Sequence, residues 1–225
     1  MTASSPDVHT IGTGTHGRYL VARPATSGPA PLLVGFHGYA QDAESCLDNL
    51  RRMPATSRWH LASVQALHRF YRGRGDATVA SWMTRQDRTL LIADNVAYAA
   101  AVVDAVRRNY PITECLVFAG FSQGVAMAYR AAARSGHACH GLISLAGDIP
   151  PDVRDAHDIM LPRVLIGRGT RDEWYSAGAM EADVAHLRNR GVPARTVVFD
   201  GGHEWGDAFV DEADRFLAGV ERRQA

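Results

Sequence analysis

Short apolar runs alternate along this chain with longer stretches in which apolar residues recur at helical spacing. The apolar runs predict buried strands at residues 32–36, 59–66, 116–120, 141–146, 164–167 and 195–199. The helical patterns predict helices at residues 43–53, 89–109, 125–134, 176–190 and 207–220. Continuous apolar strands separated by helices are typical of a mostly parallel sheet that helices cover on both faces. The pattern therefore predicts an α/β fold.

The same pattern leaves little chain for a second unit. No internal repeat occurs, and the segment Pro24–Pro31 is short enough to be a turn between two elements. Almost every other stretch is assigned to the sheet or to its helices. We therefore predict one domain over residues 1–225, with a core from about residue 18 to 220 and no separate lid domain.

Charge adds no macromolecular partner to this picture. Lys plus Arg and Asp plus Glu each total 24, so the formal net charge is zero at pH 7. A neutral chain provides no global electrostatic reason to expect nucleic acid or an anionic membrane as a partner. Several arginines gather between Arg69 and Arg88, and we interpret this stretch as a solvated loop and a helix start.

Cysteine usage and the first residues bear on the compartment. The three cysteines are an odd number without C-x-x-C spacing, which disfavours a disulfide framework and a cysteine-rich zinc site. The first ten residues lack the basic and apolar regions of a signal peptide, and no uninterrupted apolar stretch of about 18 residues occurs. We expect a cytoplasmic protein without an integral membrane segment, metal or cofactor, and the sequence is compatible with a homodimer.

The sharpest chemical signal is the segment Gly120–Gly124, G-F-S-Q-G. It matches the pattern G-x-S-x-G between an apolar strand and a helix. A serine on a strained strand-to-helix turn points its hydroxyl out of the sheet, and the flanking glycines avoid Cβ collisions in the tight bend. The helix that follows also directs its positive end toward developing negative charge. We predict Ser122 as a nucleophile.

Serine is a weak nucleophile at neutral pH and needs an adjacent base. His203 lies in the glycine-rich loop F-D-G-G-H-E-W, after a late strand and before the last helix, and it is the predicted base. Other histidines that follow the serine fall in helical or turn contexts, which indicates exposed or packed side chains. They are His137, His140, His157 and His186.

The acid that orients the base is expected soon after the strand at residues 164–167. The segment V-L-I-G-R-G-T-R-D-E-W-Y places Asp172 there, where it would hold the histidine tautomer and stabilise the imidazolium. Glu173 is the neighbouring alternative, and Asp148 and Asp200 are more remote ones. An aspartate before a helix can also be a simple N-cap.

Acyl transfer also needs donors for the oxyanion, usually two backbone N–H groups. Gln123, the residue after the nucleophile, supplies the first predicted donor. The second is expected in the loop F-H-G-Y-A-Q-D after an early strand, at Tyr39. His37 in the same loop precedes the nucleophile and ends a buried strand, so we interpret it as a structural hydrogen-bonding residue.

Together these segments resemble the phospholipase/carboxylesterase family of α/β-hydrolases, which includes acyl-protein thioesterases and small bacterial carboxylesterases. The resemblance covers about residues 32–217 and depends on F-H-G-Y, G-F-S-Q-G, G-R-G-T-R-D and G-G-H-E-W in that order. It implies a single-domain α/β-hydrolase fold with Ser122, Asp172 and His203 as a catalytic triad. It also implies an oxyanion hole formed by the N–H groups of Tyr39 and Gln123.

Three segments depart from the family's pattern. H-G-Y-A-Q-D replaces H-G-x-G-D, S-W-M-T stands where many members have W-F-D, and E-W-Y follows the acid instead of Pro and an aliphatic pair. All three lie near the expected substrate pocket, so the family's substrates are not carried over. The candidate pocket walls are Tyr39, Trp82, Met83 and Trp205, with ordinary core packing as the alternative.

The predicted activity is that of a serine carboxylic ester hydrolase, which forms an acyl-enzyme with small or medium acyl esters. A small-molecule ester is the expected partner. A thioesterase, lysophospholipase or peptidase of the same fold would use the same triad, because the triad recognises a carbonyl rather than a leaving group. A catalytically inactive binding module is the remaining alternative. The sequence has no H-x-H or H-E-x-x-H spacing that would indicate a metal-dependent hydrolase.

Overall fold

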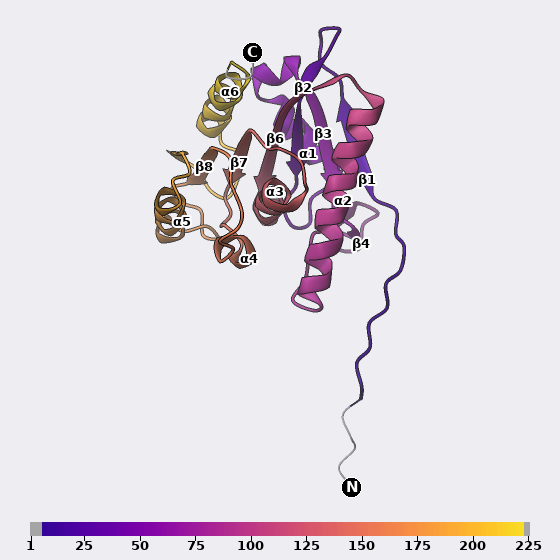
Figure 1. Ribbon diagram of the computed structural model, residues 1–225. Helices are drawn as coiled ribbons and strands as arrows, with labels where there is room; N and C mark the ends of the chain where they lie inside the picture. Colours follow the sequence, from indigo (N-terminus) through magenta and orange to yellow (C-terminus); the bar gives the residue numbers. More distant parts are fainter. Residues whose placement is uncertain (1–5, 223–225) are drawn as a thin grey trace.

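A seven-stranded sheet forms the centre of the computed structural model, which describes residues 6–222 (Figure 1). In spatial order the strands are β1 (Arg18–Ala22), β3 (His60–Gln65), β2 (Ala30–Phe36), β6 (Ile112–Phe121), β7 (Gly141–Leu145), β8 (Val164–Gly169) and β9 (Ala194–Phe199). Strand β1 runs antiparallel to β3, and every other neighbouring pair is parallel. The predicted mostly parallel sheet is confirmed.

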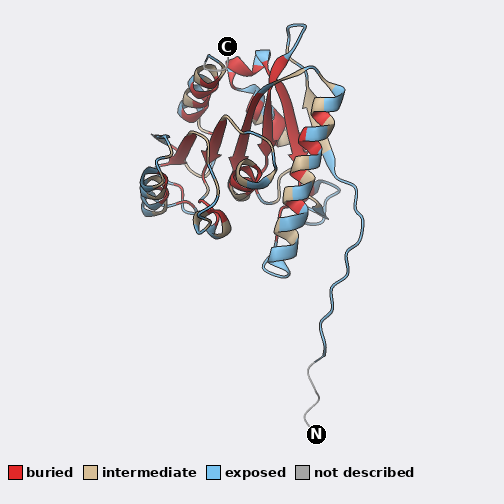
Figure 2. Ribbon diagram, in the orientation of Figure 1, coloured by how far each residue is buried: buried red, intermediate tan, exposed pale blue. Residues whose placement is uncertain are grey.

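Helices cover both faces of this sheet, and the strands between them are buried (Figure 2). The helices are α1 (Ala43–Arg51), α2 (Arg88–Asn109), α3 (Gln123–Arg134), the single turn α4 (Pro151–Arg154), α5 (Ala177–Asn189) and α6 (Asp207–Glu221). Leu32 and Val34 of β2 pack in one apolar cluster with side chains of α2, α3 and α5. Leu33 packs in a second cluster with side chains of α1 and α6. A strand buried on both faces has to be apolar throughout, which is why its sequence shows no alternation.

Helix α2 is exposed along one side. Among the helices within residues 6–222, α2 is the one whose length and composition alone would suit a membrane span. Its inner face carries Val102, Val103 and Val106 into the core beside α3. Near its start, the buried Asn95 donates from Nδ2 to the carbonyl oxygen of Trp82 at 2.7 Å. In this structure α2 therefore covers the sheet and holds the loop that precedes it.

Several elements escaped the analysis of the sequence. The hairpin of β4 (His68–Tyr71) and β5 (Thr78–Ser81) occupies much of the arginine-rich stretch that we interpreted as a loop. All four residues of β4 are exposed, so the strand has no apolar side to recognise. The hairpin also pairs with the loop after β2, because Gln41 and Ala80 form an antiparallel bridge. This pairing is a long-range event that the local pattern does not reveal.

The parallel strands bring their carboxyl ends to one edge of the sheet. The loops that follow β2, β6, β7, β8 and β9 therefore meet there, and in open α/β sheets this edge is where ligands bind. All the residues predicted for the catalytic triad and the oxyanion hole lie in these loops or at the start of α3.

Candidate active site

Ser122 occupies a sharp turn between β6 and α3. Its backbone has φ 53° and ψ −122°, a conformation that side chains with a Cβ rarely adopt. The turn is tied to the neighbouring strand, because the Ser122 N–H donates to the carbonyl oxygen of Leu145 at 2.9 Å. Val125 N–H then donates to the Ser122 carbonyl at 2.9 Å, and the helix begins. The strained turn that the G-x-S-x-G pattern predicts is present.

Two glycines of the motif occupy positions where a Cβ has no room. A Cβ on Gly120 would lie 2.4 Å from the carbonyl oxygen of Gly124. A Cβ on Gly124 would lie 2.1 Å from the carbonyl oxygen of Phe36, at the end of β2. The turn can therefore pack against the loop after β2 only because both residues are glycine.

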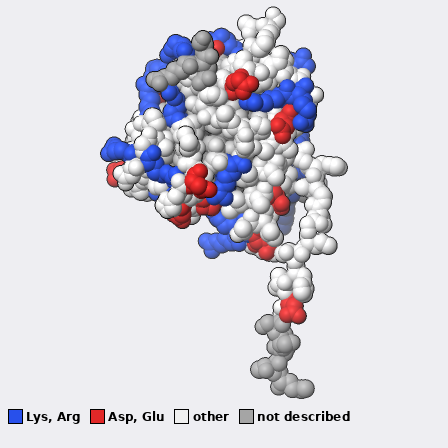
Figure 3. All heavy atoms as spheres, in the orientation of Figure 1, with Lys and Arg blue, Asp and Glu red and all other residues white. Residues whose placement is uncertain are grey.

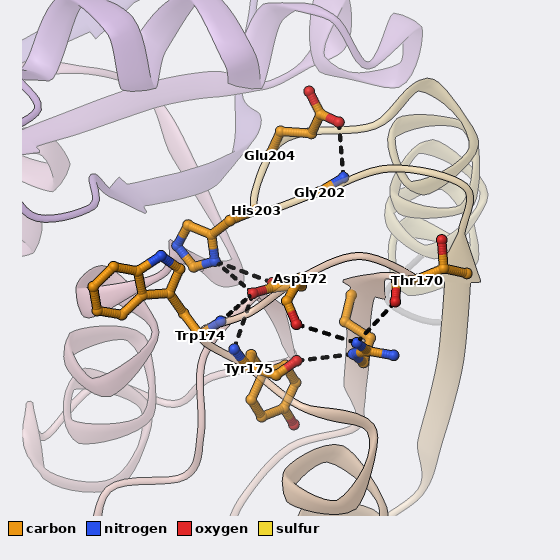
Figure 4. A network of polar contacts seen from close by, with 8 residues as sticks. Thr170, Asp172, Trp174, Tyr175, Gly202, His203 and Glu204 are labelled. Atoms are coloured by element: carbon orange, nitrogen blue, oxygen red, sulfur yellow. Dashed lines mark hydrogen bonds and ion pairs between the residues drawn. The ribbon is translucent and has the colours of Figure 1, made fainter.

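His203 and Asp172 meet through their side chains (Figure 4). The Nδ1 atom of His203 lies 3.0 Å from each carboxylate oxygen of Asp172. The Asp172 carboxylate also accepts from the backbone N–H groups of Trp174 and Tyr175, both at 2.9 Å, and the residue is only 5% exposed. These three donors hold the buried carboxylate in one position, and the carboxylate in turn fixes the plane of the imidazole.

The three alternative acids have other surroundings. Glu173 is exposed and, among residues 6–222, makes no hydrogen bond to the imidazole of His203. Asp200 pairs instead with Arg171. Asp148 is exposed and lines the cavity that also contains Ser122. Asp172 is therefore the acid that the fold joins to His203.

A buried arginine supports the loop that carries this acid, and the analysis of the sequence missed it. Arg168, near the end of β8, donates from Nε to the carbonyl oxygen of Tyr175 at 2.8 Å and from a terminal nitrogen to that of Asp172 at 3.3 Å (Figure 4). The hydroxyl of Tyr175 donates to Asp183 of α5 at 2.8 Å. Burial raises the pKa of both Tyr175 and Asp183. A charged residue within an otherwise apolar strand is the signal that could have identified Arg168.

The loop after β2 is held from several sides. The side-chain oxygen of Gln41 accepts from the Gly38 N–H at 2.8 Å, and Ala40 has a positive φ of 54°. The backbone N–H of Tyr39 has no acceptor among residues 6–222. Gln123 is the first residue of α3, where an N–H has no partner within the helix. Neither predicted oxyanion donor therefore has an acceptor among residues 6–222.

His37 lies at the base of this loop, with both ring nitrogens engaged. Its Nε2 accepts from the Ala66 N–H at 3.0 Å, so Nδ1 carries the proton and donates to the carbonyl oxygen of Gly38 at 2.7 Å. Burial lowers the pKa of His37, which keeps the ring neutral in this role. These contacts agree with the structural role that we predicted for this histidine.

Gln123 also acts through its side chain, which the analysis of the sequence did not foresee. Its amide oxygen accepts from the Trp82 N–H at 2.9 Å, and its amide nitrogen donates to the Met83 carbonyl at 3.1 Å. The indole N–H of Trp82 donates in turn to the carbonyl oxygen of His37 at 2.8 Å. Gln123 therefore ties the start of α3 to the segment before α2.

Two of the candidate pocket walls belong to the core, and this corrects our expectation. Trp82 is 0% exposed and packs edge-on against Phe36. Trp205 is 9% exposed and lies between Phe121 and Phe209. Burial of a large aromatic ring contributes strongly to stability, and both tryptophans are buried in the core rather than exposed to the cavity.

The other two candidate walls differ from each other. Met83 lines the cavity that contains Ser122. The ring of Tyr39 is 62% exposed and packs on Phe70 of the hairpin, with ring centroids 5.8 Å apart. Tyr39 is not among the residues that line this cavity, and its ring contacts the hairpin instead, which corrects our expectation of a pocket wall.

Ser122, Gln123 and His203 line one cavity of about 440 Å³. Met83, Tyr175 and the 85% exposed Trp174 contribute to its walls. A cavity of about 430 Å³ between α6 and the starts of β8 and β9 is lined mainly by arginine and apolar residues and contains no serine, histidine or cysteine. Of these two cavities, the first contains both the predicted nucleophile and the predicted base. Within residues 6–222, no three His, Cys, Asp or Glu side chains are grouped to hold a metal ion.

Comparisons with known proteins agree with this architecture. A scan of protein-family models and a search of curated proteins found no match to the sequence. The solved structure of esterase PE8 superposes with a TM-score of 0.73 at 22% identity, covering 92% of this chain and 100% of that one. The chain has the α/β-hydrolase fold.

Two further solved structures are similar over nearly their whole length. The carboxylesterase of Bacillus cereus gives a TM-score of 0.71 at 15% identity, covering 91% of this chain and 94% of that one. Acyl-protein thioesterase 2 of Zea mays gives a TM-score of 0.68 at 18% identity, covering 91% of this chain and 99% of that one.

Proposed function

We propose that this protein is a serine carboxylic ester hydrolase that works through an acyl-enzyme. One observation carries the proposal: Ser122, on its strained turn, lines the same cavity as His203, whose imidazole is bound to the buried Asp172. This combination of a serine exposed by strain, an oriented imidazole and a buried acid is what covalent acyl transfer requires.

The proposed reaction has two halves. In the first, the Ser122 hydroxyl attacks the ester carbonyl, and His203 takes its proton and gives it to the departing alcohol. In the second, water attacks the acyl-serine while His203 again accepts a proton. His203 then returns this proton to the Ser122 oxygen as the bond to the acyl group breaks and the carboxylic acid leaves. Asp172 fixes the imidazole tautomer and stabilises its charged form without taking the proton. The N–H groups of Tyr39 and Gln123 bind the oxyanion in both halves.

Similar proteins support an acyl-transfer reaction of this kind. The compared structures are those of an esterase, a carboxylesterase and an acyl-protein thioesterase. A carboxylesterase and a thioesterase both attack an acyl carbonyl, and the first releases an alcohol whereas the second releases a thiol. The thioesterase among them makes thioesters the second substrate class to test.

The test is a pre-steady-state burst with 4-nitrophenyl acetate, together with labelling by a fluorophosphonate. We expect a burst of one 4-nitrophenolate per enzyme and one labelled serine. Ser122→Ala is expected to lose the label and to lower kcat by about a thousandfold or more. Ser57→Ala is the control, because Ser57 is exposed and, among residues 6–222, its hydroxyl bonds only to the Pro54 carbonyl of its own turn. Turnover and labelling that persist in Ser122→Ala would refute the assignment.

Leaving-group selectivity is measured on matched oxoester, thioester and amide substrates. We expect oxoesters to be cleaved with the highest kcat/KM. A higher value for the thioester would change the assignment to a thioesterase with the same nucleophile. A chain that binds ligands but neither labels nor turns over would be an inactive binding module.

A further inference from the structure

Two arginines in the wall of the Ser122 cavity form no ion pair with any acidic residue in the described part of the chain. Figure 3 shows acidic and basic side chains interspersed over one face of the molecule. Arg130 pairs with Asp152, and Arg154 pairs with Asp183. Arg85 and Arg88, by contrast, line the cavity and make no ion pair or side-chain hydrogen bond with any of residues 6–222.

The local charge around this pair is positive. Arg88 is the first residue of the 22-residue helix α2, so the positive end of the helix dipole adds to the two guanidinium charges. Asp148 is the one acidic side chain in the same wall. Asp87 lies between the arginines in the chain, but it does not line the cavity and its side chain does not cap the helix. The wall therefore carries more positive than negative charge.

Neutral esters would make no use of these groups. A guanidinium presents a planar set of N–H donors that matches a carboxylate or a phosphate group. A cavity of about 440 Å³ is within the usual size of small-molecule sites, so one ligand can reach both the serine and the arginines.

We infer that the preferred substrate is an ester with a second, negatively charged group, which Arg85 and Arg88 bind while Ser122 attacks the ester carbonyl. The inference rests on the proposed function and narrows its substrate class. The charged group can belong to the acyl part or to the alcohol part of the ester. In either position, the arginines select the substrate and take no part in bond cleavage.

The experiment uses two pairs of esters that differ in charge. The acyl pair is mono-4-nitrophenyl adipate and its methyl ester, and the alcohol pair is 4-acetoxybenzoate and its methyl ester. For each pair, the ratio of kcat/KM for the anionic ester to that for the neutral ester is the quantity compared. In the wild type this ratio is expected to exceed one for at least one pair. It is also expected to shrink between about 0.05 M and 0.5 M NaCl, because salt screens exposed charges.

Variants test whether Arg85 and Arg88 cause the preference for anionic esters. Arg85→Ala and Arg88→Ala are each expected to lower the ratio by about fivefold through KM, since water weakens exposed ion pairs. Asp148→Asn is expected to raise the ratio, because it removes the one opposing charge from the wall. Arg108→Ala is the matched control, because Arg108 lies at the far end of the same helix and is also exposed. Melting temperatures identify any variant that fails to fold.

The outcomes separate this inference from the proposed function. An enzyme that hydrolyses both neutral esters, but whose ratio is the same in wild type and in the Arg85→Ala/Arg88→Ala double variant, overturns the inference alone. A protein that neither reacts with a fluorophosphonate nor cleaves any of the four esters overturns the proposed function as well. If the arginine variants lower the ratio for only one pair of esters, the inference is supported. That pair then shows whether the charged group belongs to the acyl or the alcohol part of the substrate.

Discussion

Gly124→Ala is the substitution that most directly tests how the site is assembled. Gly124 is the second residue of α3, and it faces the end of β2 at the point where the loop with Tyr39 begins. An added Cβ would lie 2.1 Å from the carbonyl oxygen of Phe36 and 2.6 Å from that of His37. Both neighbours are backbone atoms, so no side-chain rotation can relieve the contact.

The size of the effect follows from these distances. Carbon–oxygen contacts in proteins are comfortable at about 3.3 Å, so the helix and the loop would have to separate by about 1 Å. Overpacking of this kind costs about 1–3 kcal/mol of unfolding free energy. The same shift separates the predicted oxyanion donors on Tyr39 and Gln123, and a displacement of about 1 Å at a reacting centre can lower the rate by about 100-fold.

The assay combines denaturant unfolding with kcat for a 4-nitrophenyl ester. Gly178→Ala is the matched control, because Gly178 is also the second residue of a helix and a Cβ there meets nothing within 4 Å. Alanine is the better helix former, so the control is expected to gain up to about 1 kcal/mol. Gly124→Ala is expected to lose stability and activity despite the same propensity gain. Wild-type stability and kcat in Gly124→Ala would refute the steric argument.

Three further predictions concern side chains around the site and in the core. Asp172→Asn is expected to lower kcat by about 10⁴-fold, because an amide favours the wrong imidazole tautomer, with little change in melting temperature; a kcat within tenfold of wild type would contradict this role. Gln123→Leu is expected to cost about 1–3 kcal/mol in denaturant unfolding, because it leaves the Trp82 N–H without an acceptor and removes one of the two donors to the Met83 carbonyl. A change below about 0.5 kcal/mol would show that the Gln123 side chain is dispensable for stability. Burial lowers the pKa of His60, so the unfolded state binds the extra proton and stability falls as the pH drops below the unfolded pKa of about 6.5. His60→Leu is therefore expected to flatten the fall in unfolding free energy between about pH 7 and pH 5, and an unchanged pH profile would exclude His60 as its source.

The sequence by itself determined most of the central sheet and the strained turn at Gly120–Gly124. Continuous apolar runs predict strands that are covered on both faces, because burial on both sides demands apolar residues at every position. The segment Gly120–Gly124 predicts its own turn, because the clash that forbids a Cβ there involves residues close in sequence as well as β2. Each of these signals depends mainly on residues that are close in sequence, so it can be recognised without knowledge of the fold.

Only the tertiary structure decided which side chains face the cavity. Trp82 looked like a pocket wall, but its partners His37 and Gln123 lie 45 and 41 residues away in the chain, and they draw it into the core. Arg85 and Arg88 looked like ordinary solvated residues, yet the start of α2 brings them beside Ser122. The strands β4 and β5 pair with each other, and the single bridge between Gln41 and Ala80 joins their hairpin to the loop after β2. The environment of an aromatic ring or a charged group depends on segments that come together only in the folded chain. The local pattern of apolar residues does not predict those contacts.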